Sequence, residues 1–123
     1  MKKFKSVIDS YKIKNFKAVA TAAVRTAANG KDFVADVKSE TGIEIETVTG
    51  DKEAALIFEG VKQAVKLGAE TCLIMDIGGG SVEFILASTN GIIWKKSYPI
   101  GAAKLMALFH HSDPISPEEI TQI

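Results

Sequence analysis

The chain has 123 residues, a length that suits one ordinary domain. Apolar residues make up 46% of it and charged residues 24%, which is typical of a globular protein and argues against intrinsic disorder. Fifteen basic and fifteen acidic side chains give a formal net charge of zero, so the charge balance disfavours nucleic acid as a partner.

Helix and strand patterns alternate along the first half of the chain. Apolar residues recur at helical spacing in three segments, and glycines at positions 42 and 68 close the second and third of them. Two short apolar or β-branched runs separate these segments. The pattern predicts, in chain order, a helix over residues 2–14, a strand over 16–21, a helix over 30–41, a strand over 43–48 and a helix over 52–67.

The second half begins with strands. Three strand-like runs, over residues 71–77, 82–88 and 92–98, predict an antiparallel meander, and Asn90-Gly91 indicates a hairpin with a type I′ turn. A helix is predicted over residues 102–110. The segment "SPEE" at 116–119 then combines an N-cap serine, a proline and a capping-box glutamate, which predicts a further helix start.

Three consecutive glycines, Gly78, Gly79 and Gly80, separate the first two strands of this meander. They indicate either a turn that only glycine can make or a bound group that comes close to the backbone. No helix follows them and no G-x-x-x-x-G-K pattern is present, which excludes a Rossmann loop and a Walker A loop. A glycine-rich hairpin tip exposes backbone N–H groups to an anion, and Ser81 adds a hydroxyl donor. We therefore predict a phosphate-binding loop.

Two acids flank the glycine loop. Asp76 precedes it and Glu83 follows it, so across a hairpin their carboxylates are expected to point into the same volume. Two carboxylates beside a phosphate-binding loop suit a divalent cation held against phosphate oxygens. Asp76 and Glu83 are therefore the predicted ligands of Mg²⁺ or another divalent cation.

Four ordered blocks of the sequence resemble one known family, the exopolyphosphatase and guanosine pentaphosphate phosphohydrolase (Ppx/GppA) family. The block "DIGGGSVEFIL" at 76–86 resembles its second phosphate loop, and "ATAAVRTAANG" at 20–30 resembles its A-T-x-x-x-R segment. The blocks "EIETVTGDKEAALIFEGV" at 44–61 and "IGAAKL" at 100–105 resemble two others. Together they cover most of the chain.

The resemblance implies a role for each matching residue. Glu53 matches the catalytic glutamate that activates the attacking water, while Asp76 and Glu83 match acids that hold the metal or orient water. Residues on phosphate-binding positions are Gly78, Gly79, Gly80, Ser81, Arg25 and Thr21. Two departures from the family pattern are visible. Lys52 stands where the family often has a glutamate, and the first phosphate loop, of the form D-x-G-S-N-S, is absent.

The resemblance also implies an α/β fold of the actin-like ATPase superfamily, built on ribonuclease-H-like subdomains. Residues 1–68 are expected to form the C-terminal part of the first subdomain, and residues 69–123 the N-terminal part of the second, with the phosphate loop. The chain is thus interpreted as a fragment that is inactive on its own. The strand near Ala18 is expected to have an unpaired edge, which favours a homo-oligomer.

The implied activity is metal-assisted hydrolysis of a terminal phosphoanhydride bond, in polyphosphate or guanosine pentaphosphate. Two alternatives remain: an ATP-using kinase or ATPase of the same superfamily, and a phosphate-binding module without catalysis. No membrane partner is expected, because no apolar run approaches the ~20 residues of a membrane span and no signal-peptide pattern opens the chain. A single cysteine, Cys72, suits the cytoplasm.

Overall fold

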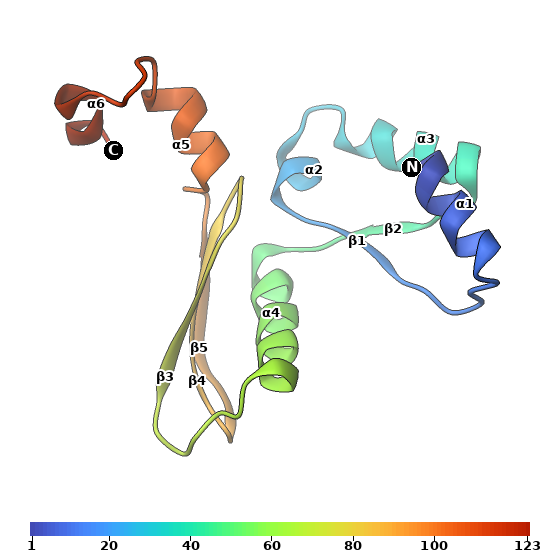
Figure 1. Cartoon of the computed structure of the whole chain (residues 1–123), viewed down its shortest axis with the longest axis horizontal. Helices are drawn as coiled ribbons and strands as arrows, with labels where there is room; N and C mark the ends of the chain where they lie inside the picture. Colours follow the sequence, from blue (N-terminus) through green and yellow to red (C-terminus); the bar gives the residue numbers. More distant parts are fainter. The chain divides into compact units, whose positions relative to one another are not determined.

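The structure is a computed structural model that describes all residues from Met1 to Ile123. It divides into two compact units, Met1–Val48 and Thr49–Ile123. Figure 1 labels the helices and strands of both units. The predicted subdomains divide the chain after residue 68 instead, and that assignment stays a prediction. None of the helices is both long and apolar enough to cross a membrane.

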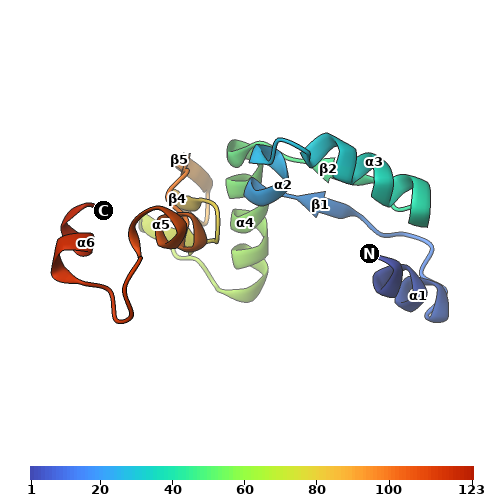
Figure 2. The ribbon, with the colours of Figure 1, turned by 90° about the horizontal axis from the view of Figure 1, so that it is seen from above.

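The first unit is a small α/β arrangement around two parallel strands. Its elements are α1 (Lys2–Ser10), β1 (Ala18–Ala20), α2 (Ala22–Thr26), α3 (Gly30–Thr41) and β2 (Ile45–Thr47). The strands pair in parallel, with Val19 opposite Glu46. Helices α2 and α3 connect the two strands, and α3 lies along the pair (Figure 2). The helix α3 ends at Gly42 as predicted, since Gly42 adopts the left-handed conformation with a φ of 70°.

Parts of the first unit remain uncovered. Strands β1 and β2 form a two-stranded sheet, so each has one free edge, as expected for the strand near Ala18. The predicted apolar face of the first helix is also exposed: Phe4 of α1 is 66% accessible, and Tyr11, directly after the helix, is 77% accessible. This unit therefore has unpaired backbone groups and apolar side chains at its surface.

The second unit contains the predicted three-stranded meander. Its elements are α4 (Gly50–Ala64), β3 (Cys72–Ile77), β4 (Val82–Ser88), β5 (Gly91–Tyr98), α5 (Ala102–Phe109) and α6 (Pro117–Thr121). The sheet order is β3-β4-β5 and both pairs are antiparallel. Helix α4 packs on one face of this sheet, with Ala54 and Phe58 against Ile85 and Ala87 of β4. Those four buried side chains form its apolar core.

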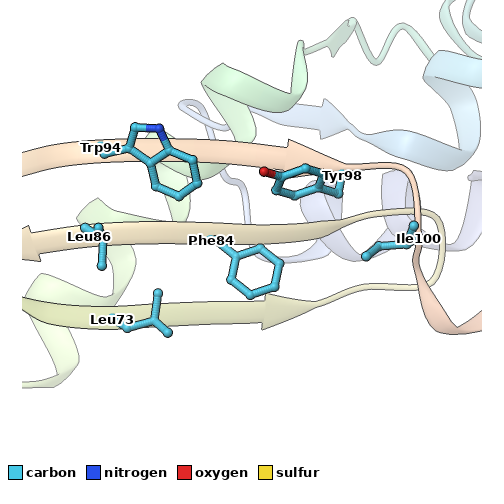
Figure 3. A pocket seen from close by; sticks show the side chains of 6 residues that line it. All are labelled: Leu73, Phe84, Leu86, Trp94, Tyr98 and Ile100. Carbon is cyan, nitrogen blue, oxygen red and sulfur yellow. The ribbon is translucent and has the colours of Figure 1, made fainter.

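The opposite face of the sheet carries an open apolar groove of 380 Å³. Figure 3 shows six side chains from the three strands and the segment after β5 gathered on this face: Leu73, Phe84, Leu86, Trp94, Tyr98 and Ile100. Leu73 is 57% and Ile100 45% accessible, so these residues line the surface without being buried. Helix α4 covers only the other face.

The β4–β5 hairpin differs from the predicted type I′ turn. Ser88 pairs with Gly91, so the two residues at the tip are Thr89 and Asn90, and only Gly91 has a positive φ, of 123°. A β-bulge between Leu86 and Ala87 shifts the register of this pair of strands. The hairpin prediction is confirmed, but the turn type is wrong, because Asn90 lacks the positive φ that a type I′ turn requires.

The predicted capping box at α6 is present and extends to the preceding loop. The Ser116 hydroxyl accepts from the Glu119 amide, and the Glu119 carboxylate accepts in return from the Ser116 amide at 2.8 Å. The same carboxylate also accepts from the Ser112 hydroxyl and from the amides of His111 and Ser112. The Ser112 hydroxyl and the Ser116 amide lower the pKa of Glu119 to about 2.

These contacts make the attachment of α6 sensitive to acid. A carboxyl group with a lowered pKa stabilises the folded state above its unfolded pKa, and that contribution is lost as the pH falls through its folded pKa. We expect the loop–α6 contacts to weaken between the ordinary value of 4.5 and about 2. Glu119→Gln should speed hydrogen exchange of the His111 amide at neutral pH, measured by NMR, and Glu118→Gln is the control. An unchanged exchange rate in Glu119→Gln would contradict this prediction.

Candidate functional site

The glycine loop is the tip of the β3–β4 hairpin. Ile77 and Val82 form the last strand pair, and the Gly78 amide donates to the Ser81 carbonyl at 2.9 Å, which leaves Gly79 and Gly80 at the tip. Neither Gly78 nor Gly79 has a φ in the left-handed region. A Cβ added at Gly79 would meet only the Ala103 Cβ, at an ordinary 3.6 Å. Within the chain itself, neither strain nor lack of space requires glycine at position 79.

Helix α5 holds this loop from one side. The amides of Ala102 and Lys104 donate to the carbonyls of Gly78 and Gly79, at 2.9 and 3.1 Å. The N-cap of α5 is Gly101, which has no side chain to satisfy the first amides of the helix. The carbonyls of the glycine loop therefore serve as acceptors for the start of α5.

The two predicted metal ligands lie directly opposite each other. Asp76 of β3 pairs with Glu83 of β4, so their side chains lie on the same face of the sheet, with Cβ atoms about 5 Å apart in such pairs. Glu83 is only 1% accessible, whereas Asp76 is exposed. The Ser97 hydroxyl of β5, opposite Glu83, donates to Glu83 Oε1 at 2.6 Å. A row of three polar side chains thus crosses the sheet beside the glycine loop.

These acids suit a magnesium ion in number and type. No group of three or more His, Cys, Asp or Glu side chains in the 123 residues is placed to hold a metal. Mg²⁺ often needs only one or two carboxylates, because it keeps several waters and binds substrate phosphates as well. One exposed and one buried carboxylate beside the glycine loop fit that donor set.

Glu53 lies in the first turn of α4. The helix begins after Thr49, whose hydroxyl accepts from the Lys52 amide at 3.2 Å. The Asp51 carboxylate in the same turn pairs with the Lys95 ammonium of β5 at 3.4 Å. Because Lys95 is two residues from Ser97 on β5, α4 begins toward the end of the sheet that carries the acids and the loop. Glu53 itself is half-buried.

The other two predicted phosphate ligands belong to the first unit. Thr21 is the N-cap of α2, and Arg25 lies in the last turn of that helix. The Arg25 guanidinium donates from Nη1 to the Val48 carbonyl at 2.8 Å. One guanidinium donor of Arg25 is therefore used in a hydrogen bond to Val48, the last residue of the first unit.

Ser97 and Gly101 contact the candidate site and were not predicted from the sequence. Ser97 contacts Glu83 only because the register of β5 places it opposite Glu83, and the β-bulge in this hairpin hides that register. Gly101 belongs to the block "IGAAKL", whose resemblance to the family was the one sequence signal that pointed to it. Its contact with the glycine loop depends on the tertiary structure.

Comparison with known sequences agrees with the family resemblance of the four sequence blocks. The sequence model of the Ppx/GppA phosphatase family matches residues 1–123. The bifunctional 3-dehydroquinate synthase/phosphatase of Fusobacterium nucleatum is 39% identical over 112 residues, which cover 89% of this chain and 17% of that protein. Exopolyphosphatase 1 of Mycobacterium tuberculosis is 36% identical over 97 residues, 79% of this chain and 28% of that protein. The chain thus spans less than a third of either relative.

Comparison with solved structures agrees. An exopolyphosphatase from Cytophaga hutchinsonii matches with a TM-score of 0.93 and 40% identity, over 98% of this chain and 39% of that one. The Ppx/GppA family member of Aquifex aeolicus matches with a TM-score of 0.76 and 33% identity, over the same shares. The predicted α/β fold of the actin-like ATPase superfamily is confirmed. The resemblance seen in four sequence blocks extends to the whole chain, which belongs to the Ppx/GppA phosphatase family.

Proposed function

We propose that this chain is part of an exopolyphosphatase-like phosphohydrolase that removes the terminal phosphate of polyphosphate or guanosine pentaphosphate. The observation that carries the proposal is the gathering of three features at one end of the second unit. These are the glycine loop, the opposed pair Asp76 and Glu83, and the first turn of α4 with Glu53. Relatives named exopolyphosphatase support polyphosphate as the substrate.

In the proposed reaction, Glu53 accepts a proton from a water molecule as the water oxygen forms a bond to the terminal phosphorus. The phosphoanhydride P–O bond breaks, and its electron pair stays with the oxygen of the shortened phosphate chain. Amides of the glycine loop and the Ser81 hydroxyl donate to the oxygens of the transferred phosphoryl group. A Mg²⁺ ion held by Asp76 and Glu83 would offset negative charge on those oxygens when bound.

Arg25 and Thr21 are proposed to contact phosphate oxygens of the substrate. Arginine suits this role because its guanidinium presents several donors in a fixed plane and forms short, charge-assisted bonds to phosphate. The threonine hydroxyl supplies a further donor. Both residues belong to the first unit.

We also propose a cytoplasmic homo-oligomer. The free edges of the β1–β2 pair and the exposed apolar residues of α1 support association, since such edges pair readily with another chain. Hydrolysis itself is proposed for a protein of the relatives' length, and the 123 residues alone are expected to release little phosphate. One phosphate loop can bind an anion. Two phosphate loops that contact the substrate from different sides would align the terminal phosphorus better with the attacking water.

A phosphate-release assay tests the proposal. It compares polyphosphate, guanosine pentaphosphate and ATP as substrates, for the 123 residues and for a protein of the relatives' length that contains them. We expect divalent-metal-dependent release from one of the first two substrates by the longer protein. Release from ATP alone would favour the kinase or ATPase alternative. Binding of polyphosphate without any release would favour the non-catalytic module.

A further inference from the structure

Gly101, at the junction of β5 and α5, lies unusually close to the glycine loop. A Cβ added at Gly101 would be 2.4 Å from the Gly79 carbonyl carbon, 2.4 Å from the Ser81 nitrogen and 2.5 Å from the Gly79 oxygen. All three are backbone atoms, so none of them can rotate away as a flexible side chain would. Gly101 has a φ of −66° and a ψ of 156°, which any residue can adopt. Only the close approach requires glycine here.

The close approach brings the start of α5 within hydrogen-bonding distance of the loop. The Ala102 and Lys104 amides donate to the carbonyls of Gly78 and Gly79. The peptide bonds after Gly78 and Gly79 are trans, because the cis bond of the chain is at Asp113-Pro114. In a trans peptide the N–H points away from the C=O of the same plane. The amides of Gly79 and Gly80 therefore point away from α5.

This orientation decides which backbone groups the loop presents to a ligand. Consecutive N–H groups on one side of a turn form an anion-binding concavity, whereas carbonyl oxygens on that side would repel a phosphate. We infer that Gly101 is a positioning residue: it lets α5 hold the loop carbonyls so that the loop presents its N–H groups to phosphate. This inference rests on the proposed phosphate-binding function of the loop.

The test measures binding of inorganic tripolyphosphate with Mg²⁺ to the 123-residue chain by calorimetry. Gly101→Ala is expected to weaken binding by about tenfold or more, because hydrogen bonds to a charged group are lost when the loop shifts. Gly60→Ala is the matched control. It lies in α4, where an added Cβ meets no atom within 4 Å, and its affinity should equal that of the unsubstituted chain.

A second variant covers the case in which Gly101→Ala does not fold. Ala102→Pro removes the amide that donates to Gly78 without adding a Cβ at position 101. Proline is tolerated at the first position of a helix, and the extended ψ of Gly101 suits a residue before proline. We expect weaker tripolyphosphate binding with α5 still helical, and smaller NMR shift changes of the Gly79 and Gly80 amides on titration.

The outcomes distinguish phosphate binding by the glycine loop from the positioning role of Gly101. An unsubstituted chain whose loop amides do not respond to tripolyphosphate would overturn both the phosphate-binding function and the role of Gly101. A response that stays unchanged in folded Gly101→Ala, or in Ala102→Pro, would overturn only the role of Gly101. A loss in both variants with unchanged Gly60→Ala supports the inference.

Discussion

Glu53→Gln, in a protein of the relatives' length, is expected to lower phosphate release by at least about 10²-fold, the lower end for loss of a general base. Glutamine keeps the shape of the side chain and removes its ability to accept a proton. Substrate affinity should change little, so the effect should appear in kcat rather than in KM. Steady-state kinetics with polyphosphate and Mg²⁺ measure both parameters.

The control for this substitution is Glu59→Gln, an exposed glutamate on the same helix. It removes an equal charge from α4 at a position outside the first turn, and turnover should stay near that of the unsubstituted protein. Turnover of Glu53→Gln equal to that of the control would leave Glu53 with a purely structural role. An acid in the first turn of a helix stabilises it through the helix dipole, by about 0.3–1 kcal/mol.

Gly79→Val is expected to weaken tripolyphosphate binding by roughly 10²-fold, comparable to losing two hydrogen bonds to a charged group. The fold should tolerate the substitution, since Gly79 has no left-handed φ and its Cβ would meet only the Ala103 side chain. The valine side chain would add bulk to the tip of the loop that is proposed to bind phosphate. Calorimetry gives the affinity, and circular dichroism gives the helix content.

Thr89→Val serves as the control for the loop substitution, because it places valine at the tip of the other hairpin. It should leave both affinity and helix content unchanged. Unaltered tripolyphosphate binding in Gly79→Val would mean that the glycine tract is simply a turn. A loss of helix content would instead show that position 79 matters for folding.

Most of the fold could be predicted from the sequence because its elements have clear periodicities. The three strands of the meander and the long helix α4 were predicted within a few residues of their bounds. Helix α2 was missed, since its five residues (Ala22–Thr26) are too few to show a helical repeat. The predicted type of the second hairpin turn was wrong. A β-bulge shifts the register of β4 and β5 from the one that Asn90-Gly91 had suggested.

The candidate site was only partly predictable, for a related reason. Asp76, Glu83 and the glycines lie within one hairpin, so local spacing was enough to predict that they lie together. The contact of Ser97 with Glu83 requires the register of a third strand. The contact of Gly101 with the loop requires the position of a helix. Neither arrangement leaves a periodic signal in the sequence.

The apolar groove on the open face of the sheet has a practical consequence, because it contains a natural optical probe. Trp94 is the single tryptophan of the chain, and it is 44% accessible on that face. Indole emission shifts to shorter wavelength when water is excluded from the ring. Fluorescence of the unlabelled protein therefore reports directly whether another segment, a second copy or a detergent has covered this face of the sheet.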